Sequence, residues 1–312
     1  MKLSVVIPIY NEEKNIRPLF QKIKETLKND VAFEIVFVDD DSNDSTLSIL
    51  DGLSRQFSGV VRYVSFARNF GHQTAIRAGL FYSKGDCVLT MDGDFQHPPE
   101  LIPLMLARWQ EGYEIVNAKR KHAQGIGYFK KITSCVFYKM NNVLTEFKIE
   151  EGVADFRLMD RKIVDHINTL NEENLFIRGI VSWLGFRQSF VEYEQPARLS
   201  GVSKYTIKKM FSLALSGITS FSVKPLRLAL ALGSLFSVFA FLYGAYAIVA
   251  YFLGRSLPGW ASVLVSVLFI GGVQLICVGI IGEYLAKVHM QVKNRPLFVI
   301  KGQSCDGDEL HE

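Results

Sequence analysis

Short apolar runs alternate with amphipathic segments through the first half of the chain. Residues 3–9, 33–38, 60–66 and 87–91 are rich in Val, Ile, Leu and Phe, which is typical of buried β-strands. The amphipathic segments between these runs are typical of helices. Strands that alternate with helices in this way predict an α/β fold with a mostly parallel sheet.

Polar residues follow each predicted strand. Residues 11–13, which begin with an asparagine, carry a helix-start signal, and residues 44–46 carry the same signal for the next helix. The loops at 8–12, 39–42 and 92–96 follow the carboxyl ends of strands, where open α/β sheets bind their ligands. We therefore expect these three acidic loops to converge on one crevice.

Two long apolar segments, 228–253 and 260–281, lie towards the C-terminus. Each exceeds the roughly 20 residues that a helix needs to cross a bilayer, so both are predicted transmembrane helices. The alternative is a pair of buried core helices, which a domain of this size rarely contains. Basic residues lie outside the two segments, whereas the loop between them carries only Arg255, so both termini are predicted to be cytoplasmic.

These features divide the chain into four predicted parts. Residues 1–202 form a cytoplasmic catalytic domain, 203–226 amphipathic helices at the membrane interface, 227–286 two transmembrane helices, and 287–312 a cytoplasmic tail. The first apolar run ends at Pro8 and reads as a strand, so we expect no cleavable signal. The predicted location is the inner, cytoplasmic membrane, as a multi-pass protein.

Composition and charge exclude several classes of function. A hydrophobic content of 49% fits a membrane anchor, and a net charge of +4 is too small to predict nucleic-acid binding. The four cysteines show no CxxC spacing, which fits a reducing compartment and argues against zinc. His72, His97, His122 and His166 are scattered and lack the spacing of a metal site.

Two carboxylates, Asp92 and Asp94, directly follow the fourth predicted strand. Hard oxygen ligands at this spacing suit Mg²⁺ or Mn²⁺ that bridges a diphosphate. The alternative is a solvated turn that caps the helix begun by Pro98 and Pro99, a role that Asp94 could share. The position after a strand favours the metal interpretation.

Three carboxylates, Asp39, Asp40 and Asp41, follow the second predicted strand. They would repel one another unless donors or a cation compensate. A nucleoside supplies such donors through the N–H of its base and its ribose hydroxyls. A helix N-terminus also favours acids, but this alternative explains Asp44 and Asp41 better than it explains Asp40.

Five motifs occur in order along the chain: PIYNEE at 8–13, VDDDS at 38–42, RNFGH at 68–72, DGDFQHPPE at 92–100 and DFRLM at 155–159. This series resembles the family 2 glycosyltransferases. Within that family the chain is most similar to the polyprenyl-phosphate glycosyltransferases, which include bactoprenol glucosyltransferase and dolichyl-phosphate mannose synthase. The resemblance covers nearly the whole chain and implies a GT-A fold, an inverting mechanism and a divalent metal, Mg²⁺ or Mn²⁺.

The resemblance also assigns roles to individual residues. The residues implied to bind the nucleotide sugar are Pro8, Tyr10, Glu12, Val38, Asp40, Asp92, Gly93 and Arg120. Those implied to hold the metal are Asp94 and Gln96, and those implied to bind phosphate or the acceptor are Arg198 and Lys204. The sequence departs from the family pattern at three positions, because Gly93 stands where Ala is usual, and Ala154 and Asp41 each replace a common Gly.

Asp155 is the catalytic base that the resemblance implies. The second pKa of a phosphate monoester is about 6, so a polyprenyl phosphate is largely ionised at neutral pH and needs little deprotonation. Asp155 would therefore orient the acceptor or complete proton removal from its monoanionic form. The alternative is an ion pair with Arg157.

The implied partners are a nucleotide diphosphate sugar, a polyprenyl phosphate and the lipid bilayer, and a homo-oligomer is left open. UDP-glucose with undecaprenyl phosphate is the preferred substrate pair. GDP-mannose, UDP-GlcNAc or an aminoarabinose derivative are alternative donors, because sugar choice depends on a few hydroxyl contacts. A polysaccharide synthase would need a QxxRW segment, which the chain lacks, and a non-catalytic membrane scaffold would have lost the acidic motifs.

Overall fold

Eight strands form one sheet in the order β7-β5-β6-β4-β1-β2-β3-β8. The computed structural model describes residues 1–27, 31–121, 152–172, 176–194, 223–254 and 259–304. Within them the strands are β1 (Lys2–Ile9), β2 (Ala32–Asp39), β3 (Val61–Phe66), β4 (Cys87–Thr90), β5 (Ile115–Arg120), β6 (Val153–Asp160), β7 (Gln188–Tyr193) and β8 (Ile300–Gln303). Six strands run in one direction and β6 and β8 run in the other, which confirms the predicted mostly parallel sheet.

β1 lies in the interior of the sheet, and this position explains the apolar run at residues 3–9. It pairs in parallel with β2 and with β4, and all of residues 3–9 are buried. A strand covered on both faces requires continuous apolar side chains rather than alternating ones. The register aligns Ile9 with Asp39 and Val6 with Thr90, so the three strands end at the same edge.

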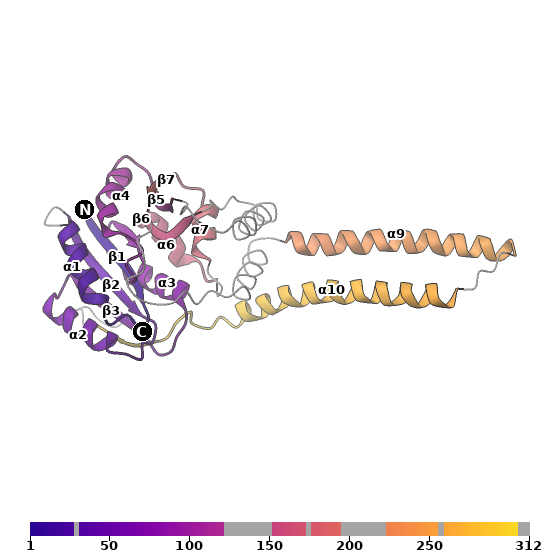
Figure 1. Cartoon of the computed structure of the whole chain (residues 1–312), viewed down its shortest axis with the longest axis horizontal. Coiled ribbons are helices and arrows are strands. Elements are labelled where there is room, and N and C mark those ends of the chain that lie inside the picture. Colours follow the sequence, from indigo (N-terminus) through magenta and orange to yellow (C-terminus); the bar gives the residue numbers. More distant parts are fainter. Residues whose placement is uncertain (28–30, 122–151, 173–175, 195–222, 255–258, 305–312) are drawn as a thin grey trace. The chain divides into compact units, whose positions relative to one another are not determined.

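Helices cover both faces of this sheet (Figure 1). On one face, α1 (Ile16–Leu27), α2 (Thr46–Gln56) and α4 (Ile102–Gln110) share a core with the strands. On the other, α3 (His72–Tyr82) packs on β1 and β2, and α6 (Arg161–Thr169) packs on β4 and β6. The short helices η1 (Pro99–Leu101) and α7 (Ile177–Trp183) complete the described helices of this unit.

The expected start of the first helix is wrong. Asn11 does not open the helix, which begins at Ile16, because residue 11 has a left-handed backbone with φ 57° and is used by a neighbouring loop. Its N–H donates to Ser42 Oγ and its Oδ1 accepts from the Asn43 N–H. The second helix begins at Thr46 as predicted, and Asp44 Oδ1 accepts its N–H at 3.0 Å.

β8 is a strand that the sequence did not predict, because it lies in the segment expected to be a tail. It pairs antiparallel with β3, and the N–H of Ala67 donates to the carbonyl of Val299 at 2.9 Å. The rings of Phe66 and Phe298 stack with centroids 5.4 Å apart. Residues 296–304 therefore belong to the same compact unit as the first seven strands.

A second compact unit contains two long helices, α9 (Lys224–Phe252) and α10 (Trp260–Val292). Both are long and apolar enough to cross a membrane, and both match the predicted segments. Large apolar side chains point outwards, including Phe241 at 77% exposure and Leu275 at 74%. This exposure contradicts the alternative of buried core helices.

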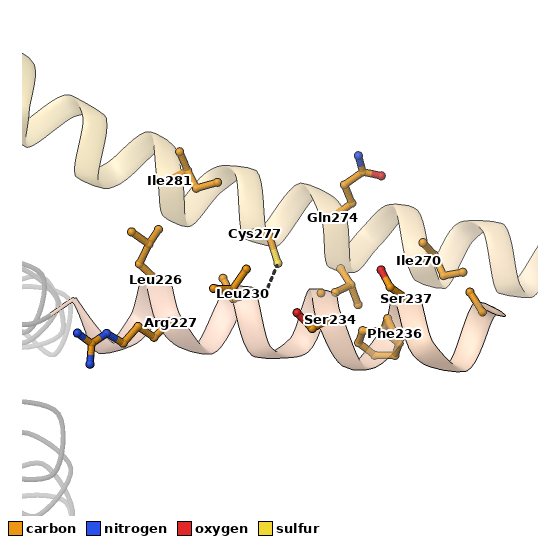
Figure 2. Close-up of a pocket in the computed structure, with 14 residues that line it drawn as sticks. Leu226, Arg227, Leu230, Ser234, Phe236, Ser237, Ile270, Gln274, Cys277 and Ile281 are labelled. Atoms are coloured by element: carbon orange, nitrogen blue, oxygen red, sulfur yellow. Dashed lines mark hydrogen bonds between the residues drawn. The ribbon is translucent and has the colours of Figure 1, made fainter. Parts of the chain in front are cut away.

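A groove of about 970 Å³ lies between α9 and α10 (Figure 2). Its lining is mostly apolar, and Leu226, Leu230 and Phe236 contribute to it from α9. Ile270 and Ile281 contribute from α10, where Cys277 also approaches the Ala229 carbonyl at 3.9 Å. The two helices thus contact each other along a face of small and apolar side chains.

Gly79 on α3 provides a test of how closely this helix packs on the sheet. A Cβ at Gly79 would overlap the Val6 side chain and lie 3.2 Å from Val38 Cγ2. Overpacking of this kind costs about 1–3 kcal/mol, so Gly79→Ala should lower the melting temperature of this unit. Thermal unfolding followed by intrinsic fluorescence in detergent measures the shift.

Gly52 is the matched control, because it lies inside α2 and a Cβ there would approach Arg17 no closer than 3.9 Å. Alanine is favoured over glycine in a helix interior by about 0.5–1 kcal/mol, so Gly52→Ala should leave the melting temperature unchanged or raise it. Equal shifts of the same sign in both variants would contradict the close packing of α3.

Candidate active site

Asp40, at the carboxyl end of β2, is buried and binds the start of α3. Its Oδ1 accepts the N–H of Phe70 at 2.6 Å and its Oδ2 accepts the N–H of Gly71 at 2.9 Å. Burial raises the pKa of Asp40 above its ordinary value, and the two backbone N–H groups oppose that shift. Asp40 therefore fixes the loop that leads into His72.

The other carboxylates after β2 have their own partners. Asp39 Oδ2 accepts the hydroxyl of Ser65 at 2.8 Å and its Oδ1 accepts the N–H of Ser42 at 3.1 Å. Asp41 has a left-handed backbone with φ 61°, a conformation that favours glycine, which the family resemblance implies at this position. The expected repulsion among these carboxylates is thus relieved partly by the chain itself.

The loop after β1 lies beside the loop after β2. Pro8 and Val38 are register partners on adjacent strands and are both buried, and Tyr10 is 43% exposed. The N–H of Glu12 donates to Thr46 Oγ1 at 3.2 Å, which ties this loop to the start of α2. The structure therefore brings together the predicted nucleotide-binding residues of β1 and β2.

The loops after β1, β2 and β4 each contain a non-glycine residue with positive φ. Among the described residues, four non-glycine residues have positive φ, and three of them, Asn11, Asp41 and Phe95, occur one in each loop. This conformation is unfavourable for most L-residues and for a bulky residue such as Phe95 is a genuine outlier. Backbone strain is therefore concentrated at the predicted crevice.

Asp94 and Gln96 lie in the loop after β4. The N–H of Gln96 donates to Asp94 Oδ1 at 3.1 Å, and Gln96 is buried. A Cβ at Gly93 would lie 2.6 Å from Ile9 Cδ1, so the alanine that is usual in relatives requires Ile9 to move. The absence of a side chain at residue 93 lets this loop approach the end of β1.

His97 is buried completely next to Asp92. Its Nδ1 accepts the N–H of Asp92 at 2.9 Å, so the proton lies on Nε2, which is 3.5 Å from Asp92 Oδ2. Burial lowers the pKa of His97 despite the nearby carboxylate of Asp92, which favours the neutral ring. The ring stacks on Phe156 at 5.0 Å, and this packing holds the Asp92 loop against β6.

His72, the first residue of α3, lies between two carboxylates. Its Nε2 is 3.4 Å from Asp92 Oδ1 and 3.8 Å from Asp155 Oδ2. Both carboxylates therefore lie within 4 Å of the same imidazole nitrogen. The predicted donor-binding and catalytic positions therefore meet in one site.

Asp155, on β6, is held by two arginines. Arg178 of α7 donates from Nε to Oδ1 and from Nη2 to Oδ2, both at 2.8 Å, and Arg157 Nη2 lies 3.6 Å from Oδ1. Burial acts to raise the pKa of Asp155, but the guanidinium of Arg178, helped by Arg157 and His72, holds that pKa well below its usual range. A carboxylate with so low a pKa is a weak proton acceptor.

Arg120, at the end of β5, completes the described cluster of predicted site residues. Its Nε donates to the Tyr193 hydroxyl at 3.1 Å, and the Tyr193 ring meets the His97 ring edge-on at 6.3 Å. Arg120 therefore lies near His97, which itself contacts Asp92. Arg198 and Lys204 lie outside the described residues.

The carboxylate oxygens of Asp92 and Asp94 could bind a divalent ion if oxygen atoms of a bound diphosphate completed its coordination. Among the described residues, no group of three or more His, Cys, Asp or Glu side chains is arranged to hold a metal. Asp92 Oδ1 is buried without a hydrogen-bond partner within the described part of the chain. An orphaned carboxylate oxygen beside Asp94 is compatible with a cation or a ribose hydroxyl, because either would satisfy it.

Three functional candidates were missed by sequence reasoning. The spacing of His72 and His97 predicts no metal site, although they lie inside the motifs RNFGH and DGDFQHPPE and both contact Asp92. Arg178 carried no sequence signal, because its partner Asp155 lies 23 residues earlier. The expected ion pair of Asp155 with Arg157 is found, with Arg157 Nη2 3.6 Å from Asp155 Oδ1. Arg178 is the closer partner, because its Nε lies 2.8 Å from the same oxygen.

Comparisons with known proteins agree with this geometry. A family model described as "Glycosyl transferase family 2" matches residues 4–167, and one described as "GtrB C-terminal hairpin" matches residues 224–288. The SfII prophage-derived bactoprenol glucosyl transferase of Shigella flexneri is 44% identical, with 96% of this chain and 98% of that protein covered. The uncharacterized glycosyltransferase YkcC of Bacillus subtilis (strain 168) is 42% identical over 96% of this chain and 94% of that protein.

His97→Phe tests whether this buried ring positions the Asp92 loop. Phenylalanine preserves the stacking on Phe156 but removes the acceptor of the Asp92 N–H. A buried donor left without a partner costs about 1–3 kcal/mol, so the melting temperature should fall by several degrees. Thermal unfolding of the purified protein measures this change.

His166→Phe is the control, because His166 is exposed in the last turn of α6. An exposed substitution usually changes stability by less than about 0.5 kcal/mol. If both variants unfold at the wild-type temperature, His97 does not hold the loop.

Proposed function

We propose a reaction for this chain, which belongs to glycosyl transferase family 2. It transfers glucose from UDP-glucose to undecaprenyl phosphate or a similar polyprenyl phosphate at the cytoplasmic face of a membrane. The observation that carries this proposal is the 44% identity to a bactoprenol glucosyl transferase, which extends over 98% of that protein. A second model, that of the GtrB C-terminal hairpin, matches 224–288 and extends the similarity to the membrane-type helices.

The transfer forms one bond and breaks one bond. An oxygen of the acceptor phosphate attacks the anomeric carbon of the sugar from the face opposite the diphosphate. The bond between that carbon and the diphosphate oxygen breaks, and UDP leaves with the electron pair. The acceptor is already largely ionised, since the second pKa of a phosphate monoester is about 6, so alignment and charge stabilisation dominate the barrier.

The donor would bind across the ends of β1, β2 and β4. Tyr10 is exposed at this edge and could cover the base. Asp40 and Glu12 would lie beside the base, and the register partners Pro8 and Val38 would form an apolar floor below it. Asp92 and Gly93 would face the ribose and diphosphate, and Arg120 would approach a phosphate from β5. The support for this placement is that these residues share one sheet edge.

Asp94 and Gln96 would hold Mg²⁺ or Mn²⁺. Such an ion, when bound, stabilises the negative charge that develops on the leaving diphosphate. The support from this chain is its oxygen-rich loop, in which Asp94 already accepts the Gln96 N–H and Asp92 Oδ1 lacks a hydrogen-bond partner among the described residues.

Asp155 would act in catalysis through orientation of the acceptor rather than as a strong base. Its two oxygens are engaged by Arg178, and its pKa is held low, so it would accept a proton poorly. The role of Arg198 and Lys204 in phosphate binding remains a proposal from the family resemblance.

The membrane arrangement is proposed to be a catalytic domain followed by two spans. α9 and α10 would cross the bilayer within residues 227–286. Most of the amphipathic segment expected at 203–226 lies outside the described residues. β8 follows α10 and lies in the same sheet as the strands that precede α9, which supports emergence of both hairpin ends on one side. Lys224, Arg227 and Lys293 lie near those ends, which favours the cytoplasmic side.

The substrate pair can be tested directly with purified protein. We expect UDP-glucose to give the highest kcat/KM with undecaprenyl phosphate, and GDP-mannose and UDP-GlcNAc to react far more slowly, because hydroxyl contacts discriminate sugars strongly. Chromatography of the lipid product measures transfer, and NMR of the anomeric proton should show inversion. Faster transfer from another donor would reassign the sugar, and no lipid product from any donor would contradict the proposed acceptor.

Asp94→Ala tests the metal assignment. Loss of one group that stabilises developing charge typically lowers turnover by about 10²–10³-fold, so transfer at saturating Mg²⁺ should fall by at least that amount. Thermal unfolding should stay close to that of the wild type, because Asp94 is not fully buried.

Asp165→Ala serves as control, because Asp165 is an exposed carboxylate on α6 that pairs only loosely with Arg161 at 3.8 Å. It should retain wild-type turnover. If Asp94→Ala turns over at the wild-type rate, Asp94 does not hold the metal ion.

A further inference from the structure

The C-terminal segment, residues 296–304, pairs with the strand that leads into α3. The N–H of Ala67, the first residue after β3, donates to the Val299 carbonyl at 2.9 Å. Further back along β3, the N–H of Ser304 donates to the Tyr63 carbonyl at 3.0 Å. The C-terminal segment is therefore bonded to β3 up to the point where the α3 entry loop, residues 67–71, begins.

Aromatic rings extend this contact into the α3 entry loop. Phe298 stacks on the fully buried Phe66 with ring centroids 5.4 Å apart, and Phe66 meets Phe70 edge-on at 5.5 Å. Both arrangements are favourable for pairs of aromatic rings. The Arg68 guanidinium lies 4.1 Å from the centre of the Phe70 ring, a distance typical of a cation–π contact. The position of Phe70 therefore depends on packing that begins at Phe298.

The same loop leads to two carboxylates of the candidate site. The N–H groups of Phe70 and Gly71 donate to the two oxygens of Asp40, at 2.6 and 2.9 Å. His72 follows directly, and its Nε2 lies 3.4 Å from Asp92 Oδ1. The α3 entry loop therefore determines the surroundings of Asp40 and, through His72, of Asp92.

Asp40 depends on this loop for compensation of its charge. Burial raises its pKa, and the neighbouring carboxylates of Asp39 and Asp41 act in the same direction. The two N–H groups of the loop oppose these effects. A displaced loop would weaken both hydrogen bonds, because such bonds lose strength quickly as they lengthen or bend. The ionised form of Asp40 is therefore favoured only while the loop keeps its place.

We propose that Phe298 is a positioning residue for the nucleotide-sugar site, because through Phe66 and Phe70 it holds the loop whose N–H groups bind Asp40. The inference rests on the proposed binding of the donor across the ends of β1, β2 and β4. It adds a residue from the far end of the chain, which follows Val292, the last residue of α10, by six positions. Binding of the donor thus depends on a segment that is made after both long helices.

The first test measures UDP affinity by calorimetric titration, with full-length protein in detergent and Mg²⁺ present. The Kd for UDP should rise at least about fivefold in Phe298→Ala, which is the lower end of the usual coupling between linked sites. Phe298 is half-buried, so Phe298→Tyr, which keeps the ring, should bind UDP within about twofold of the wild type. Recovery in the tyrosine variant would assign the effect to the aromatic ring.

Phe57→Ala is the matched control. Phe57 is also half-buried and packs on Phe20 with ring centroids 4.6 Å apart, but it precedes β3, at the end opposite Phe66. Both alanine variants should unfold at a lower temperature than the wild type, because each loses packed aromatic surface. Only Phe298→Ala should lose UDP affinity, and Phe57→Ala should stay within about twofold of the wild type.

Hydrogen exchange of the wild type gives a second measurement, which needs no variant. If the C-terminal segment stabilises the site that binds UDP, then UDP stabilises the segment, because coupling between two sites is reciprocal. Exchange of the Ala67 and Ser304 N–H groups, which bond between β3 and the segment, should therefore slow when UDP and Mg²⁺ are added. The Val60 N–H, which donates to the Phe57 carbonyl at 3.0 Å, should exchange at an unchanged rate.

Two outcomes would overturn the inference. One is a wild-type Kd for UDP in folded Phe298→Ala, and the other is an equal loss of affinity in Phe298→Ala and Phe57→Ala. If Phe298→Ala does not fold, exchange at Ala67 and Ser304 that ignores UDP rejects the inference.

Failure of the wild type to bind UDP contradicts the proposed donor instead. In that case, exchange of the Phe70 and Gly71 N–H groups is compared between the wild type and Phe298→Tyr on one side and Phe298→Ala on the other. Faster exchange in Phe298→Ala alone supports the hold of Phe298 on the loop, and equal rates in all three proteins reject it.

Discussion

Parallel pairing of β1 with β2 on one side and β4 on the other is the constraint on which the candidate site depends. It places three strand ends at one edge, so the acidic loops that follow them share a small volume. Carboxylates gathered in this way repel one another unless donors lie close by. The chain supplies such donors locally, as backbone N–H groups for Asp40 and a hydroxyl and an N–H for Asp39.

The insertion of antiparallel β6 between β4 and β5 gives the site its second half. It brings Asp155 and Arg157 next to the DGD loop, and α7 adds Arg178 from a later part of the chain. The loops after β1, β2 and β4 are therefore rich in carboxylates, whereas β6 and α7 add two guanidinium groups around Asp155. His72 Nε2 lies within 4 Å of both Asp92 and Asp155 and so connects the two parts.

Features encoded by local sequence were predictable, and those that depend on distant contacts were not. The strands β1 to β4 and both apolar helices follow from apolar runs, and the convergence of the three loops follows from βα order. The start of α1 was misplaced because Asn11 bonds to the neighbouring loop instead of capping its own helix. Arg178 and β8 could not be predicted, since the partners of each lie far away in the sequence and no periodicity identifies them. The histidines were judged by metal-ligand spacing, a criterion that overlooks a neutral imidazole acting as a hydrogen-bond acceptor.

The pairing of β8 with β3 also determines the order in which the protein can be assembled. β8 is synthesised after both long helices, yet it forms the outermost strand beside β3. Until it emerges from the ribosome, β3 presents unpaired backbone groups and the Phe66 ring lacks its stacking partner Phe298. The sheet is therefore completed only after α9 and α10 have been synthesised. A chain cut short before residue 300 would keep an open strand edge beside β3, a feature by which quality-control proteases and chaperones could distinguish it from the finished protein.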